Sequence, residues 1–226
     1  MDEYINIPNE VRELIEDIKA SHRLFQSLED NYDLVMRGIA TIFEKASAIT
    51  GLTSEAIIQR SDFSKKDLDS DRFDAMLAEV RTIIHLDNLG FLEIQPLKAS
   101  KGSKEADLLG NWNGEKWAIE VICSSYESER WKHNEVANYI KSRFVNDGKC
   151  KQLHITAEKY NCSYKLLVVV MNSLKGKALN DRNDYQNILK DVWVNLGERK
   201  DLFLSVVTGM ETLGSGLDDC VYPPLT

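Results

Sequence analysis

Apolar residues recur at helical spacing through most of the first 60 residues. The spacing i, i+3, i+4, i+7 places them on one face of a helix, as expected for a helix that packs against a core. The two stripes comprise Val11, Leu14, Ile15 and Ile18, then Leu34, Val35, Ile39, Ile42 and Phe43. A charged run follows over 61–71. We therefore predict an N-terminal helical region over 1–70, with a domain boundary at its end.

Short strand-like runs dominate the chain after Gly90, which ends a predicted helix over 72–89. Runs rich in β-branched and aromatic residues occur at 91–97, 106–112, 116–123, 166–171 and 202–207. Asn113-Gly114, between the second and third runs, is a strong signal of a tight hairpin turn. Two further helical stretches are predicted, over 131–160 with a break near Gly148 and over 185–196.

The order of these elements indicates an α/β fold. The run from Leu167 to Val170 is apolar without interruption, which is typical of a central strand covered on both faces. We predict a mixed sheet of about five strands flanked by helices over 71–226, preceded by the helical addition over 1–70.

Composition and charge restrict the classes of function. Of the 226 residues, 43% are hydrophobic and 28% charged, as in globular proteins. No run approaches the roughly 18 apolar residues of a membrane span, and the first residues do not resemble a signal peptide, so we expect a cytoplasmic protein with no membrane partner. The net charge of −8 opposes nonspecific binding to nucleic acid. The segment 130–151 is nevertheless basic, with Arg130, Lys132, Lys141, Arg143, Lys149 and Lys151.

The four cysteines and four histidines are scattered along the chain. None of them has the C-x-x-C or H-E-x-x-H spacing that is typical of zinc sites. We therefore expect buried reduced thiols and no zinc hydrolase.

Two acidic residues flank the predicted hairpin. Asp107 begins one strand and Glu120 lies within the next, so the two carboxylates could face one site. Glu120 stands between Ile119 and Val121, and an ionised carboxylate buried among such neighbours is costly unless a cation compensates its charge. Mg²⁺ is the simplest such cation, because it prefers oxygen ligands.

A third carboxylate, that of Glu79, lies at the inner margin of the apolar face of the predicted helix over 72–89. Three carboxylates could hold a divalent ion that polarises a phosphate and generates a hydroxide-like water. Each of the three could instead reach solvent or pair with a nearby basic residue.

These features together resemble the PD-(D/E)XK nuclease superfamily. The resemblance covers about residues 72–172 and rests on a helix with an inward Glu, the letters LGF before a strand, an Asp before a hairpin, and I-E-V in the next strand. It implies a restriction-endonuclease-like core in which Asp107 and Glu120 bind Mg²⁺ or Mn²⁺ and Glu79 assists. It also implies a Lys two positions after Glu120 that orients or activates the attacking water.

Two positions depart from the pattern of the superfamily. Ala106 stands where a Pro is common, and Ile122 stands where the Lys is expected. Members of the superfamily also supply this Lys from the helix after the third strand. The candidates there are Lys141, Lys149 and Lys151, and we predict Lys151 because it lies ahead of the strand that begins near Leu166.

The resulting hypothesis is a metal-dependent nuclease that hydrolyses phosphodiester bonds in DNA, with Glu79, Asp107, Glu120 and Lys151 at its site. The alternative is a catalytically inactive relative that binds nucleic acid or another protein, and Ile122 is its main support. A third hypothesis is an unrelated α/β domain with a coincidental pair of acids. The basic loop over 98–104 is a candidate phosphate contact, and the acidic N-terminal helices are a candidate surface for a homodimer.

Overall fold

Six strands form one mixed sheet in the computed structural model, which describes residues 6–20, 25, 32–61, 70–98, 105–124, 133–146, 148–171, 182–208 and 220–225. The order of the strands in space equals their order in the chain. β3, β4 and β5 are parallel, and every other neighbouring pair is antiparallel. The strands are β1 (Leu92–Pro96), β2 (Leu108–Trp112), β3 (Glu115–Ser124), β4 (Tyr164–Met171), β5 (Leu202–Thr208) and β6 (Cys220–Tyr222).

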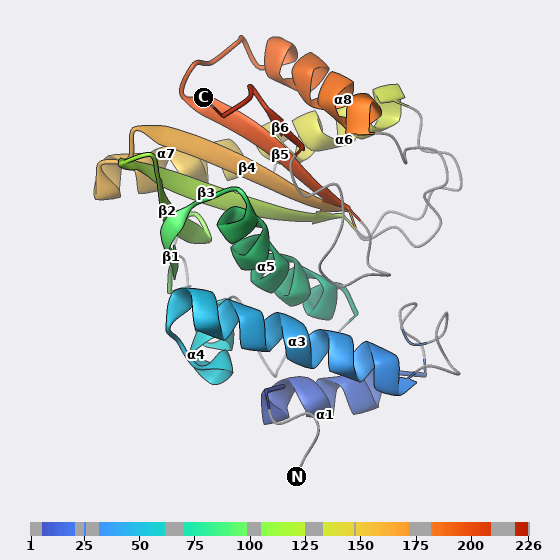
Figure 1. The fold of residues 1–226 in the computed structure, drawn as a ribbon. Coiled ribbons are helices and arrows are strands. Elements are labelled where there is room, and N and C mark those ends of the chain that lie inside the picture. Colours follow the sequence, from blue (N-terminus) through green and yellow to red (C-terminus); the bar gives the residue numbers. More distant parts are fainter. Residues whose placement is uncertain are drawn as a thin grey trace.

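Helices cover both faces of the sheet, and Figure 1 shows α3 and α1 stacked outside α5. Two hydrophobic clusters result, one shared with α1, α3, α4 and α5 and the other with α6, α7 and α8. The helices are α1 (Asn9–Ile18), α3 (Tyr32–Thr50), α4 (Ser54–Ile58), α5 (Ser70–Asn88), α6 (His133–Asn146), α7 (Lys149–Tyr160) and α8 (Arg182–Asn195).

The alternation of side chains along β3 divides it between the two clusters. Trp117, Ile119 and Val121 belong to the cluster with α5, whereas Ala118 and Ile122 belong to the cluster with α6 and α7. The next strand, β4, is buried along almost its whole length, as its continuous apolar run predicted. A polar residue in a central strand therefore lies between two apolar layers.

The predicted α/β class, the mixed sheet and the flanking helices are confirmed. The hairpin is also confirmed, since Asn113 has a φ of 51° and Gly114 a φ of 81°, the left-handed conformations that such tight turns need. The predicted strand count was one too low. The missed strand, β6, has only three residues and pairs with β5 at the edge of the sheet.

The predicted boundary near residue 70 lies between α4 and α5. The cluster around α5 nevertheless includes residues of α1, α3 and α4, so the hydrophobic core continues across this position. Most of the predicted linker (62–69) and of the basic loop (99–104) lies outside the described residues. No helix in the described ranges is long and apolar enough to cross a membrane.

The two halves of β3 have different surroundings. β2 pairs with residues 115–119, and β4 pairs with residues 117–124. Along the second half of β3, the edge that faces away from β4 therefore has no strand partner among the described residues. This open edge lies next to α5 on one face of the sheet and α7 on the other.

Candidate active site

A cavity of about 400 Å³ opens beside the second half of β3. It brings together the carboxylates of Glu79 and Asp107 and the basic groups of Arg72, Arg143 and Lys149. Its other lining residues are Ala75, Val121, Cys123, Tyr139 and Gln152. The walls therefore come from α5, β3, α6, α7 and the segment before β2.

Glu120 lies in β3 and is completely buried. Its Oε1 accepts a hydrogen bond from the Lys149 ammonium, and the two groups form an ion pair. Its Oε2 is also buried but has no hydrogen-bond donor among the described residues. A buried carboxylate oxygen without a donor is costly, so this atom has an unmet need for a proton or a cation.

Asp107 is held against the open edge of β3. Its Oδ2 accepts a hydrogen bond from the Val121 backbone N–H at 2.8 Å, where a neighbouring strand would otherwise provide a carbonyl. Its backbone carbonyl accepts from the Leu97 N–H at 2.8 Å. These two bonds hold the Asp107 carboxylate at Val121, which is next to Glu120 in β3.

Lys149 is the first residue of α7, and its side chain is 22% exposed. Gly148 precedes it with a φ of 77°, a left-handed conformation that is unstrained only for glycine. This turn begins the helix next to the sheet. Since α7 and α5 lie on opposite faces of the sheet, Lys149 reaches Glu120 from the face that α5 does not cover.

The pKa values of the Glu120 and Lys149 pair both move upward. Burial and the nearby Asp107 carboxylate raise the pKa of Glu120 well above its usual range, against the opposing effect of Lys149. Burial lowers the pKa of Lys149, but attraction to the carboxylates of Glu120, Asp107 and Glu79 outweighs it, so this pKa is raised. Both directions indicate that three carboxylates around one ammonium favour additional positive charge.

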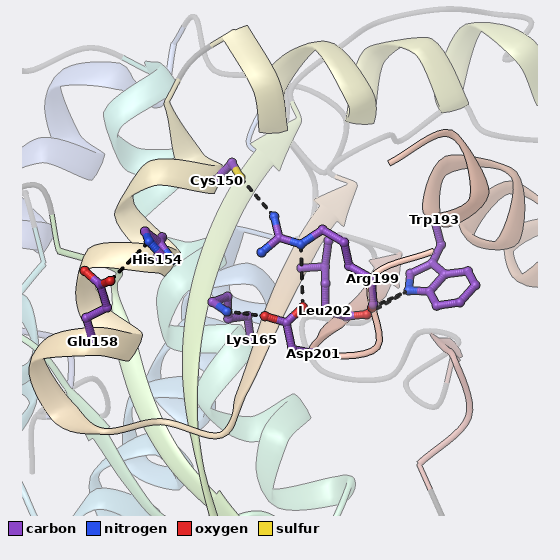
Figure 2. Close-up of polar contacts among 8 residues, drawn as sticks. All are labelled: Cys150, His154, Glu158, Lys165, Trp193, Arg199, Asp201 and Leu202. Carbon is purple, nitrogen blue, oxygen red and sulfur yellow. Dashed lines mark hydrogen bonds and ion pairs between the residues drawn. The ribbon is translucent and has the colours of Figure 1, made fainter. Parts of the chain in front are cut away.

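A network behind α7 holds its first turn in place. An Arg199 guanidinium N–H donates to the Cys150 sulfur at 3.5 Å, and Arg199 also pairs with Asp201 at 3.5 Å (Figure 2). Asp201 in turn forms an ion pair with Lys165 in β4. The residue next to Lys149 is thereby tied to the loop that leads into β5.

The structure brings together three of the four predicted site residues, namely Glu79, Asp107 and Glu120. The structure does not bring Lys151 to these carboxylates, because Lys151 is exposed and Lys149 pairs with Glu120 instead. Residues two positions apart in an α-helix point about 200° apart around its axis, so Lys149 and Lys151 face opposite ways. Lys149 is one turn before the buried Leu153, and that spacing is a signal that could have identified it.

The prediction also missed two basic residues of the cavity, Arg72 and Arg143. Arg143 lies in the basic segment over 130–151, but the sequence alone did not connect this residue with the acid cluster. Arg130 and Lys132 of that segment lie outside the described residues.

These residues could bind a hard cation that keeps several of its waters, but they do not form a site that encloses a metal ion with protein ligands alone. No group of three or more His, Cys, Asp or Glu residues within the described ranges could enclose a metal ion. Mg²⁺ does not need such a cage, since it is commonly bound by one or two carboxylates together with waters and substrate phosphates. Asp107 and Glu120, whose Oε2 has no hydrogen-bond donor among the described residues, match that requirement.

Comparisons with protein families, with curated proteins and with solved structures found no match.

Proposed function

We propose that this protein is a divalent-metal-dependent nuclease that hydrolyses phosphodiester bonds in DNA, with a core of the PD-(D/E)XK type. One observation supports this most directly. A fully buried glutamate has one oxygen on an ammonium, and its other oxygen has no donor among the described residues, next to a second carboxylate and an open cavity. A purely structural ion pair gains nothing from such an arrangement.

Asp107 and Glu120 are the residues that would hold Mg²⁺ or Mn²⁺. When bound, such an ion polarises the scissile phosphate and lowers the pKa of a water molecule. The Val121 N–H keeps the Asp107 carboxylate in place, so little reorganisation is needed on binding. Glu79 faces the same cavity and adds negative charge from α5.

Lys149 takes the role that the superfamily assigns to the Lys two positions after the second acid. Ile122, which stands at that position, is buried in the core, and Lys149 reaches the same carboxylate from α7. Its raised pKa keeps the ammonium protonated near neutral pH, so it acts as a hydrogen-bond donor rather than as a base. It can therefore orient a water or a phosphate oxygen at Glu120.

The charges around the cavity suggest the order of binding. When all are ionised, the acids Glu79, Asp107 and Glu120 and the bases Arg72, Arg143 and Lys149 carry equal and opposite formal charge. A divalent cation makes the group positive, which favours an anionic phosphodiester. We therefore expect DNA to bind the cavity strongly only after the metal.

The alternative is an inactive relative that binds nucleic acid or protein. The Lys149 and Glu120 pair favours it, because the ammonium already compensates one buried carboxylate without any metal. The two functions differ in whether the site takes up a divalent ion.

The test is cleavage of plasmid and single-stranded DNA with Mg²⁺ or Mn²⁺ by the full chain, alongside Mn²⁺ binding by calorimetry. Asp107→Asn and Glu120→Gln should each reduce cleavage by about a thousandfold, since they remove several kcal/mol of charge stabilisation. Asn retains an oxygen that can accept from the Val121 N–H. Glu158→Gln, an exposed acid on α7, is the matched control and should cleave like the wild type. Absence of both cleavage and Mn²⁺ binding would favour the inactive relative.

A further inference from the structure

Helix α7 contacts the segment that carries Asp107 along one of its faces. The Gln152 Nε2 donates to the Glu105 carbonyl at 3.3 Å, and the Thr156 Oγ1 accepts from the Ala106 N–H at 2.6 Å. Further along the helix, Lys159 and Tyr160 bind the Glu105 carboxylate at 2.7 and 3.0 Å. Successive turns of α7 thus hold the two residues before Asp107.

The contact made by Thr156 differs from the others in its burial. Thr156 is 0% exposed and Ala106 is 3% exposed, so water cannot replace this bond. The Lys159 and Glu105 pair is more open, with the lysine side chain 52% exposed, and such pairs contribute little. Thr156 is therefore the main polar link between α7 and the segment before β2.

The same helix carries Lys149 two turns earlier. A rigid helix that binds Ala106 at one position and places an ammonium at another fixes the spacing between Asp107 and Lys149. Asp107 and Lys149 approach Glu120 from different parts of the chain, and α7 both carries Lys149 and binds the residue before Asp107.

We infer that Thr156 is a positioning residue for the acid cluster, acting through the Ala106 N–H on the carboxylate of Asp107. Its contribution to metal binding rests on the proposed function. Its contribution to the placement of Asp107 does not rest on that function, because hydrogen exchange of the Val121 amide reports directly on the position of the Asp107 carboxylate.

The test compares Thr156→Val, which removes the acceptor at nearly constant volume, with Thr156→Ser, which keeps it. Thr156→Cys has a weaker acceptor and takes the place of the Val variant if that protein does not fold. Thr82→Val is the matched control. Thr82 is also 0% exposed, and its hydroxyl bonds the Ala78 carbonyl within α5 at 2.8 Å.

The first measurement is hydrogen exchange of the Val121 amide relative to the amides of β4 in the same protein. Loss of the Thr156 acceptor should speed this relative exchange about tenfold, since the Asp107 carboxylate is then less well held. Thr156→Ser should restore it, and Thr82→Val should leave it unchanged. A general loss of stability would move the β4 amides as well and leave the ratio constant.

The second measurement is the Kd for Mn²⁺, which should rise about tenfold in Thr156→Val, as for other residues that support a metal ligand. Unchanged exchange and Kd in that variant, or the same selective changes in Thr82→Val, would overturn the inference. A wild type that fails to bind Mn²⁺ while its Val121 amide responds to Thr156→Val would refute the proposed function and support the positioning role.

Discussion

Two titratable side chains, Glu120 and His85, are buried in this protein in contrasting ways. His85 in α5 is 2% exposed, and its Nε2 lies 2.7 Å from the Ser205 hydroxyl. That hydroxyl donates to the Cys220 carbonyl at 3.1 Å, so it accepts from an Nε2–H of the neutral ring. Burial and the charge of Arg81 lower the pKa of His85 to about 4, which keeps the ring neutral.

Glu120 is buried at least as deeply but is paired with an ammonium and lies beside an open cavity. His85 Nδ1 and Glu120 Oε2 both lack a hydrogen-bond partner among the described residues. A neutral ring nitrogen tolerates this at far smaller cost than a carboxylate oxygen. A perturbed pKa is therefore common to both residues. Glu120 differs from His85 in its charge, in the cost of an oxygen without a donor among the described residues, and in the cavity beside it.

Among the variants that test this comparison, the largest effect is expected from removing the ammonium that pairs with Glu120. Lys149→Met removes the donor at Oε1 and should reduce cleavage by at least about a hundredfold, as for other groups that stabilise charge in a transition state. Lys151→Met, on the exposed face of the same helix, should stay within about twofold of the wild type. Initial rates of plasmid nicking at saturating Mn²⁺ measure both. Equal losses in the two variants would contradict the assignment of Lys149.

The next effect concerns His85 and stability. Its folded pKa of about 4 lies below the unfolded value of 6.5, so protons bind the unfolded chain more readily. The stability due to neutral His85 is complete above pH 6.5 and is lost as the pH falls toward 4. The loss amounts to about 3 kcal/mol in the free energy of unfolding.

The measurement is denaturant unfolding of the wild type and His85→Gln at several pH values between 6.5 and 4. The glutamine can still donate to Ser205 but does not titrate, so its stability should fall less steeply. His154→Gln, at an exposed position of α7, should follow the wild type. A parallel fall in wild type and His85→Gln would show that His85 does not couple folding to protons.

The smallest expected effect is that of Glu79→Gln, and it ranks the three acids by their contribution to Mn²⁺ binding. Glu79 is the last of the three carboxylates in its effect on the pKa of Lys149, and it lies on α5 rather than on the open edge of β3. Glu79→Gln should therefore weaken Mn²⁺ binding by about tenfold, less than Asp107→Asn or Glu120→Gln. Calorimetric titration of the three variants under one condition gives the order. A loss as large as that of Asp107→Asn would make Glu79 a direct ligand.

The acid cluster could be predicted from sequence because its members lie in local patterns. Glu120 is surrounded by apolar strand residues, and a two-residue turn fixes which residues of the hairpin face each other. The Lys that pairs with Glu120 was not identified, although the helix break near Gly148 was predicted. Within α7 a shift of two residues reverses the direction of the side chain, so choosing Lys151 instead of Lys149 was enough to miss it.

Contacts between distant residues were beyond the reach of these patterns. The bond between Thr156 and Ala106 joins residues 50 positions apart, and the bond between His85 and Ser205 joins residues 120 apart. Neither a helical stripe nor a strand alternation identifies such partners. The short strand β6 was missed for a similar reason, because three residues give too little pattern to recognise.

The open edge of β3 has a further consequence for the behaviour of the protein in solution. An unpaired strand edge is a template on which another chain can add a strand and begin to aggregate. The Asp107 carboxylate occupies the Val121 N–H that such a strand would need and places a negative charge there. The side chain that lines the candidate site thus also disfavours the addition of a strand at this edge.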